Sequence, residues 1–315
     1  MLPISPRVDI AFKKIFGVEE NKDLLISLIN SIVSEEDKVV SVTLLNPYNP
    51  KNFKNDKLSI LDIKAQGETG KRFNIEIQIT DEADYDKRAL YYWAKLYTEQ
   101  LGAGQDYSNL TKAIGIHILN FTSIVENDKY HNVFHVKEKE TGEPYFTDLE
   151  LHTIELKKFM GQGANQSIDK IKFLAKIQTA LDLWVAFLTR HDLLNQSMSP
   201  KGLKGLKGLK GLKGLEGLEI NALKKALGVL EVMNFSAHER EAYEGHLKWM
   251  RIEATTLKKA EERAEARGEA RGEATGEIRG VEKVVINMFR KNMALDVISK
   301  ATNLSIEAIL KICKS

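Results

Sequence analysis

Residues 57–80 form two stretches of alternating apolar and polar residues on either side of a short turn. In the second stretch, FNIEIQI, every other residue is apolar, which is the period of a β-strand with one face in the core. The first stretch, SILDIKA, has the same period. A three-residue loop at 68–70, with Gly70 in the left-handed conformation, would pair Lys71 with Gly67. The sequence therefore predicts an antiparallel β-hairpin whose register is fixed by its turn.

Two acidic residues meet in this hairpin. Counting outward from the turn places Asp62 directly across from Glu76, on the same face of the sheet. Opposed like charges destabilise a sheet by roughly 0.2 to 1 kcal/mol, so we expect a positive group between them. A divalent cation fits, because Mg²⁺ commonly binds one or two carboxylates together with water and phosphate oxygens. Lys64 and Gln78 would then border the ion, whereas the pattern alone also allows a solvated polar face.

The segments around the hairpin predict a mixed α/β unit over residues 1–195. Apolar residues at helical spacing indicate two helices before the hairpin, broken near Gly17 and restarted with Asn21 as the N-cap. After the hairpin, DYDKRALYYWAKLYTEQL predicts an amphipathic helix, and AIGIHILN predicts a strand buried on both faces. The remaining elements are strands at 38–46, 132–136 and 149–156 and a helix at 167–190. This order predicts a mixed central sheet flanked by helices.

The composition changes abruptly after Pro200, where glycine occupies every third position of KGLKGLKGLKGLKGLEGLE. Each glycine costs a helix roughly 1 kcal/mol relative to alanine, and the tract lacks the prolines of collagen. We interpret residues 196–219 as a flexible basic linker, with a row of lysines for DNA phosphates as the alternative. Beyond it, residues 220–280 predict a charged helical segment and residues 281–315 a small helix-turn-helix-like tail.

The charged helical segment starts with a capping-box pattern, Ser236 followed by Glu239. Glycine then recurs every four residues, at Gly268, Gly272, Gly276 and Gly280. This period drifts by only about 40° per step, so the glycines could line a ridge for another helix, or the helix could be solvated. In the tail, Asn303 marks a turn and Ser305 an N-cap, and the last helix has few basic residues. We therefore expect these C-terminal helices to mediate docking or a homo-oligomer contact.

The overall composition excludes several kinds of function. With a formal charge of +2, any nucleic-acid surface must come from local clusters of basic residues. The single cysteine, Cys313, excludes a disulfide framework and a thiolate zinc cluster and is typical of a reducing compartment. The sequence has neither a signal-peptide pattern nor a long apolar run, so we expect a cytoplasmic protein with no membrane segment. Without a Walker-type loop or a Gly-x-Ser-x-Gly elbow, ATP use and acyl transfer are not expected.

Three groups of polar residues are weaker candidates for a site. His131 and His135 lie four residues apart and could bind a metal, but no third ligand is evident. Arg88 could contact phosphate from a helix whose aromatic stripe mainly packs in the core. Lys13 and Lys14 could touch a nucleic-acid backbone, although lysines beside an apolar stripe are usually solvated.

Five segments, in their order along the chain, resemble one nuclease family: DIAFKKIFG, LDIKA, NIEIQ, RALYYWAKLY and AEARGEARGE. An Asp on one strand and Glu-x-Gln on the next, after a helix with an acidic residue near its start, resemble the PD-(D/E)XK nuclease superfamily. More narrowly, nearly the whole chain is similar to the Rpn-type recombination-promoting nuclease, or transposase, family. The resemblance implies a restriction-endonuclease-like α/β core and an all-α C-terminal extension. The chain departs from the family in its lysine-rich linker, and from the superfamily in Gln78, which replaces the usual lysine.

The resemblance implies roles for individual residues in metal-dependent hydrolysis of DNA. Asp62 and Glu76 would bind Mg²⁺ or another divalent cation, and Gln78 would replace the lysine that orients the attacking water. Asp9 matches the acidic residue of the first helix, which approaches the metal directly or through water. The candidate contacts to the nucleic acid are Lys64, Arg88 and Lys13.

Two functions are expected on this basis. The first is a Mg²⁺-dependent DNA endonuclease associated with recombination or transposition. The alternative is a catalytically inactive DNA-binding or self-associating module with the same fold. Metal binding separates them, since an inactive module need not hold the cation.

Overall fold

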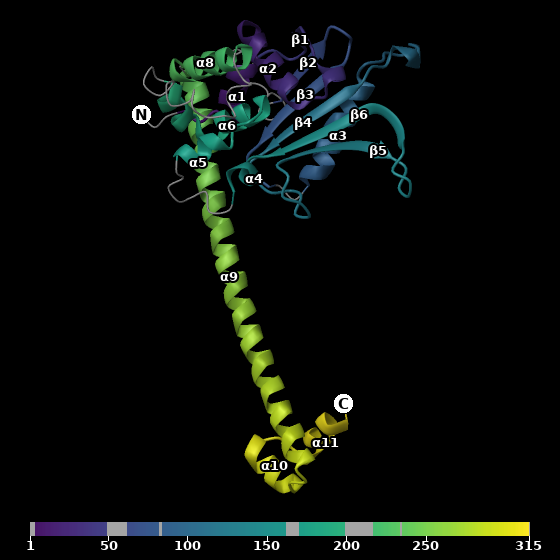
Figure 1. The fold of residues 1–315 in the computed structure, drawn as a ribbon, viewed down its shortest axis with the longest axis vertical. Coiled ribbons are helices and arrows are strands. Elements are labelled where there is room, and N and C mark those ends of the chain that lie inside the picture. The colour runs from purple at the N-terminus through teal and green to yellow at the C-terminus, as the bar shows by residue number, and fades with distance from the viewer. Residues whose placement is uncertain are drawn as a thin grey trace. The chain divides into compact units, whose positions relative to one another are not determined.

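A computed structural model of the chain describes residues 4–48, 62–81, 84–161, 170–198, 217–233 and 235–314. The chain divides into two compact units, Met1–Met250 and Arg251–Ser315. The first unit contains a six-stranded sheet, and the second consists of helices (Figure 1). Among the described residues, no helix combines the length and the apolar character needed to span a bilayer.

The sheet of the first unit is mixed. Its strands, in spatial order, are β1 (Val42–Leu44), β2 (Ile63–Gly67), β3 (Arg72–Gln78), β4 (Ala113–Leu119), β6 (Pro144–Glu155) and β5 (His131–Lys137). Strand β4 runs parallel to both of its neighbours, β3 and β6, and the other adjacent pairs are antiparallel. A crossover through helix α3 (Tyr85–Thr98) joins β3 to β4, as a parallel pair requires. The predicted fold class, a mixed sheet flanked by helices, is confirmed.

The hairpin of β2 and β3 has the predicted turn and register. Ile63 pairs with Ile75, and the Gly67 amide donates to the Lys71 carbonyl at 2.9 Å. Gly70 has a φ of 86°, in the left-handed region that favours glycine. The side-chain alternation on both strands is therefore locked to this turn.

Strand β1 is shorter than the strand predicted at 38–46. The backbone amides of Val40 and Ser41 donate to the carboxylate of Glu68 in the hairpin loop. These amides are therefore occupied by a side chain before β1 begins, and the ladder starts only at Val42.

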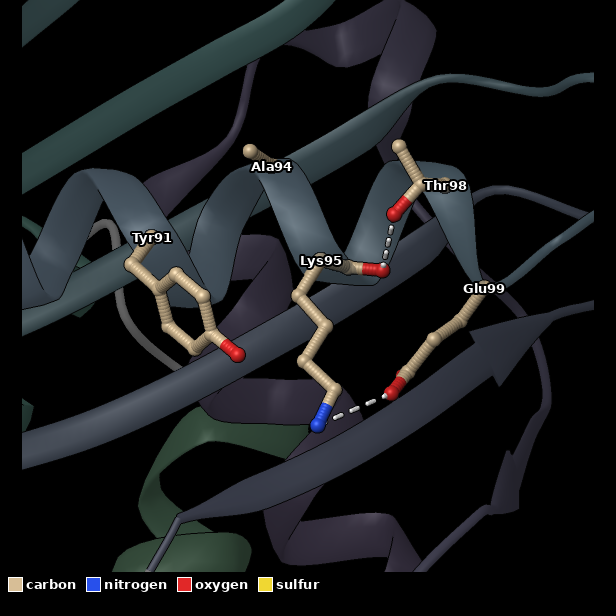
Figure 2. Close-up of a pocket in the computed structure, with 5 residues that line it drawn as sticks. All are labelled: Tyr91, Ala94, Lys95, Thr98 and Glu99. Carbon is tan, nitrogen blue, oxygen red and sulfur yellow. Dashed lines mark hydrogen bonds and ion pairs between the residues drawn. The ribbon is translucent and has the colours of Figure 1, made fainter.

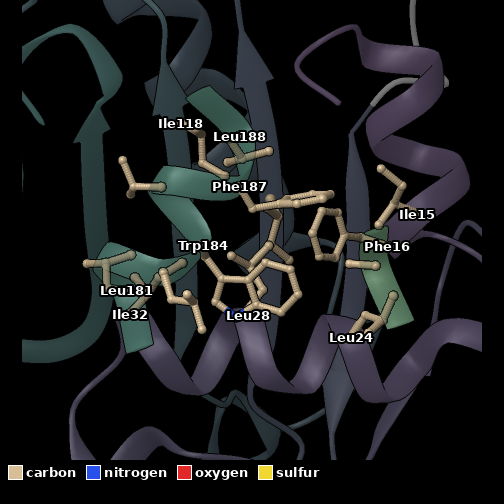
Figure 3. Close-up of a cluster of buried hydrophobic side chains, with 14 of the residues drawn as sticks. Ile15, Phe16, Leu24, Leu28, Ile32, Ile118, Leu181, Trp184, Phe187 and Leu188 are labelled. Carbon is tan, nitrogen blue, oxygen red and sulfur yellow. The ribbon is translucent and has the colours of Figure 1, made fainter. Parts of the chain in front are cut away.

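Helices cover both faces of the sheet. One face packs against α1 (Asp9–Phe16), α2 (Lys22–Ile32) and α6 (Ala180–Met198), and α4 (Leu156–Met160) follows β6. The aromatic centre of this layer is Trp184, whose ring centroid lies 5.3 Å from that of Phe16 and 5.8 Å from that of Phe187 (Figure 3). On the opposite face, Trp93 of α3 donates from Nε1 to the Ala113 carbonyl at 3.0 Å. Because both faces are covered, β4 is buried along its whole length, as predicted.

The prediction of one helix at 167–190 is wrong. Two helices lie there within the described residues, α5 (Lys170–Ala175) and α6. The reason is a helix start at Thr179, whose hydroxyl accepts the Asp182 amide at 3.1 Å, while the Asp182 carboxylate accepts the Thr179 amide at 2.9 Å. This reciprocal capping box ends the preceding turn and begins a new helix.

Helix α8 (Leu218–Glu231) packs against α1, α2 and α6 in the first unit. After it, Ser236 and Glu239 form the predicted capping box, with the Ser236 amide 2.6 Å from Glu239 Oε2. Helix α9 (Ala237–Arg290) starts there. Its last turns form a small core with α10 (Leu295–Thr302) and α11 (Ile306–Lys314), centred on Val285, Ile298 and Ile309.

Two predictions for the C-terminal helices concern turns and glycines. Asn303 adopts the left-handed conformation between α10 and α11, and the Ser305 hydroxyl caps α11 by accepting the Ala308 amide at 3.2 Å, as predicted. At the four regularly spaced glycines of α9, no atom of the described chain outside that helix lies within 4 Å of the Cβ position. Within one chain, therefore, the described helices leave this ridge open.

Candidate active site

The hairpin brings Asp62 and Glu76 to the same place. Asp62 directly precedes β2, and extending the Ile63–Ile75 pairing by one residue sets it opposite Glu76, in agreement with the predicted register. Both residues are half-buried, and the Glu76 side chain is only 16% exposed. The backbones of the hairpin thus set the two acidic residues opposite each other, and both are partly shielded from the solvent that would screen their charges.

The surroundings of Asp62 balance burial against positive charge. Burial raises the pKa of the Asp62 carboxyl above its ordinary value, while the nearby charges of Lys13 and Lys64 oppose that rise. The negative charge of Glu99 adds to it. A carboxylate in such a position favours the arrival of a further cation.

Lys13 lies in the interior of the protein. Its side chain comes from α1 and is 1% exposed, with Nζ donating to the backbone carbonyl of Asp62 at 2.9 Å. Burial lowers the pKa of the Lys13 amine to about 8. The expected contact of Lys13 with a DNA backbone does not fit this burial, because the amine faces Asp62.

Glu76 is approached by α3. Arg88 of this helix places Nη2 at 3.6 Å from Glu76 Oε1, and its guanidinium lies over the ring of Tyr85, 5.8 Å from the centroid. The Tyr85 hydroxyl in turn lies 2.5 Å from Nδ1 of His117. In the β3–β4 ladder, His117 is the direct partner of Glu76. A chain of polar contacts therefore runs from Glu76 into the core.

His117 is a site neighbour that the sequence interpretation missed. Burial, and to a smaller extent the charge of Arg88, lower the pKa of His117 to about 4, so the imidazole is neutral at physiological pH. Its one signal in the sequence is a lone polar side chain in the continuous apolar strand AIGIHIL. That signal does not reveal its partner, because the pairing with Glu76 depends on the crossover between two parallel strands.

Gln78 and Asp9 are placed on elements that border the site. Gln78 is half-buried on the same strand face as Glu76, and its Nε2 donates to the Thr80 carbonyl at 3.3 Å. Asp9 is the first residue of α1, four residues before Lys13, and buries its Oδ1 atom. One helical turn therefore separates Asp9 from the lysine that contacts Asp62.

A surface hollow lies along α3 on the side of Lys64. It has a volume of about 380 Å³ and is lined by Tyr91, Ala94, Lys95, Thr98 and Glu99 (Figure 2). Glu99 links it to the hairpin, since its carboxylate lies 3.3 Å from Lys64 Nζ and 3.5 Å from Lys95 Nζ. Glu99 thus connects this hollow to β2, the strand that follows Asp62.

The donors at the site suit a hard cation. As metal ligands, Asp62, Glu76 and Gln78 would contribute only oxygen atoms, which Mg²⁺ prefers. The remaining ligands of such an ion are commonly water and phosphate oxygens. Within the described parts of the chain, no group of three or more His, Cys, Asp or Glu side chains is arranged to hold a metal by itself. The oxygen atoms of Asp62, Glu76 and Gln78 could fill only part of the coordination sphere of such an ion.

His131 and His135 belong to a separate network on β5 and β6. His131 Nε2 lies 2.9 Å from His152 Nδ1, and His152 and His135 lie 2.6 and 3.3 Å from the two carboxylate oxygens of Glu150. The two histidines lie on the predicted strand, and each has its own partner. Its residues are separated from the hairpin by strand β4.

The chain is similar to a known protein family. Residues 6–260 match the model of a family described as PD-(D/E)XK nuclease family transposase, which is most of the chain. No curated protein and no solved structure matches the chain.

Proposed function

The chain belongs to the PD-(D/E)XK nuclease family of transposases, and on this premise we propose that it is a divalent-metal-dependent DNA endonuclease. The observation that carries the proposal is the placement of Asp62 opposite Glu76 on a half-buried sheet face. The family supports a nuclease- or transposase-related role, and recombination or transposition is the proposed setting.

In this proposal Asp62 and Glu76 hold Mg²⁺ or another divalent cation. The bound ion supplies electrophilic activation of the phosphodiester and of the attacking water. Gln78, two residues beyond Glu76, orients that water, since an amide both donates and accepts hydrogen bonds. Asp9 supports the site from the first turn of α1.

Two basic residues at the rim are proposed to bind the DNA backbone. Lys64 now pairs with Glu99 and Arg88 with Glu76, at 3.3 and 3.6 Å. Both side chains are partly exposed, so phosphate oxygens can replace the carboxylates as partners. With a metal ion bound, Glu76 would no longer need Arg88 to compensate its negative charge, and Arg88 could turn to the DNA.

The decisive experiment compares plasmid cleavage by the full chain with cleavage by the Asp62→Asn and Glu76→Gln variants in Mg²⁺. Each variant should cleave the plasmid more than roughly 100-fold more slowly than the wild type. Changes to the outer contacts of a metal site already cost up to about that much, and these variants remove a direct ligand. Circular dichroism checks that each variant is folded, because Asp62 lies near the buried Lys13 amine and Glu76 pairs with Arg88. Asp84→Asn, an exposed acidic residue before α3, is the matched control. Cleavage by Asp62→Asn at the wild-type rate would rule out the assignment.

The alternative is a DNA-binding module that has no catalytic activity. The contact between Arg88 and Glu76 favours it, because an arginine already compensates one of the two carboxylates. Calorimetric titration with Mg²⁺ or Mn²⁺, in the absence and in the presence of DNA, separates the two functions. The nuclease binds the ion in at least one of these conditions, whereas the inactive module binds DNA but not the ion.

A further inference from the structure

Asp62 lies just outside the hydrogen-bonded ladders of the sheet. The last pair between β1 and β2 joins Leu44 to Ala65, after which the Leu45 amide donates to the Lys64 carbonyl at 2.8 Å. The β2–β3 pairing begins at Ile63. Asp62 is one residue beyond the β2–β3 ladder and three beyond the β1–β2 ladder, so its position depends on other contacts.

Asn46 extends the sheet to Asp62 with its side chain. Its Nδ2 donates to the Asp62 carbonyl at 3.0 Å, and its Oδ1 accepts the Lys64 amide at 2.7 Å. One side-chain amide thus reproduces the donor and acceptor of a strand residue, on the edge where β1 has ended.

Lys13 makes the second contact to the same carbonyl, from α1. Its amine is 2.9 Å from the Asp62 oxygen, and the side chain is almost fully buried. Burying a charged amine is unfavourable unless it is bonded and compensated, and the Asp62 segment offers both a carbonyl and a carboxylate. The fold makes room for this lysine, since a Cβ on Gly17 would lie 2.9 Å from Lys13 Cγ.

We propose that Lys13 and Asn46 are positioning residues of the candidate metal site. Together they clamp the backbone carbonyl of Asp62, so that the carboxylate stays opposite Glu76. Neither side chain needs to touch metal or DNA to do this. The effect of the clamp on a metal site rests on the proposed function. The hydrogen bonds that form the clamp do not depend on that function.

The first test measures the backbone directly by amide hydrogen exchange in the full chain. Lys13→Met retains the buried aliphatic volume and removes the donor, and Asn46→Ala removes the acceptor of the Lys64 amide. We expect faster exchange at residues 62–65 in both variants, most of all at Lys64 in Asn46→Ala. Unchanged exchange in both variants would overturn the clamp, whether or not the protein is a nuclease.

The second test measures the metal site by calorimetry with Mg²⁺ or Mn²⁺ and by the kinetics of cleavage. Outer contacts that orient a ligand typically change metal affinity about 10- to 100-fold, so we expect a loss of that size in each variant. The kcat should fall with it, while the KM for DNA stays within about twofold, because a buried lysine does not bind the substrate. Wild-type metal affinity in variants whose exchange has risen would also overturn the proposal.

Two matched controls separate positioning from general damage. Asn30 makes the same pair of side-chain contacts elsewhere, with Val39 N and O at 2.8 Å each, so Asn30→Ala removes an equivalent clamp away from the site. Lys14→Met changes the adjacent lysine, whose amine lies 3.0 Å from Glu239. Both should leave exchange at residues 62–65 and metal affinity unchanged. If Lys13→Met fails to fold, Asn46→Ala alone decides; if the wild type binds no metal, the proposed function fails and exchange still tests the clamp.

Discussion

At the scale of single residues, local pattern and long-range packing differ in what they reveal. The pairing of Asp62 with Glu76 could be predicted because strand alternation and the Gly70 turn fix the register over a short stretch. Lys13 could not be assigned in the same way, since its amine reaches a carbonyl 49 residues along the chain. Its position beside an apolar helical stripe predicts solvation, and only the packing of α1 on the sheet turns it inward.

Glu239 should make the first unit sensitive to acid. Burial alone would raise the pKa of its carboxyl, but hydrogen bonds from Tyr48, Ser236 and Lys14 outweigh burial and lower the pKa to about 2. A carboxyl with a lowered pKa stabilises the fold fully above its ordinary value of 4.5 and loses that contribution as the pH falls towards about 2. The unfolding temperature should therefore decrease across this range.

Thermal unfolding followed by circular dichroism between about pH 2 and pH 6 checks this expectation. Glu239→Gln should unfold at lower temperature near neutral pH and show a flatter acid slope. Glu19→Gln, which alters an exposed pair with Lys22, should keep the wild-type slope. An acid slope in Glu239→Gln as steep as in the wild type would contradict the assignment.

At the scale of helices and strands, periodicity predicted the elements and missed where side chains interrupt them. The helices α1, α2 and α3 and the buried strand β4 were predicted because their apolar residues follow one period. Strand β1 is shortened by the Glu68 carboxylate, and the predicted helix at 167–190 is divided by the Thr179 capping box. In both places a polar side chain takes over backbone groups that regular pairing would have used.

The Thr179 capping box should contribute measurably to stability. Thr179→Ala removes the hydroxyl that accepts the Asp182 amide, a change that typically costs about 1 kcal/mol. Chemical denaturation of the full chain measures the loss. Gln178→Ala is the control, because its contact with Asp182 is made by the backbone and survives the change. Equal stability of Thr179→Ala and the wild type would show that α6 starts without help from this residue.

At the scale of the whole chain, the sequence predicts boundaries at 195, 219 and 280, which stay predictions. Two observations bear on experiments with shortened chains. Helix α8 buries Leu223 and Ala226 in the main core, so a chain ending near residue 195 would expose that core. The compact first unit ends at Met250, which is the appropriate place to cut.

A chain ending at Met250 tests the proposed homo-oligomer contact of the C-terminal helices. The glycine ridge of α9 is open, and Ile278 and Val284 are exposed at 61% and 49%, which a second copy could cover. We expect light scattering to give an oligomeric mass for the full chain and a monomeric mass for the shortened one. An oligomeric shortened chain, or a monomeric full chain, would contradict this contact.

The base of α9 and the Asp62 clamp share two short stretches of backbone. Glu239, in the first turn of α9, bonds to Lys14 and to Tyr48. Lys14 is the neighbour of Lys13, and Tyr48 stands two residues from Asn46. The start of this long helix and the two residues that hold the Asp62 carbonyl are thus anchored at neighbouring positions of the chain.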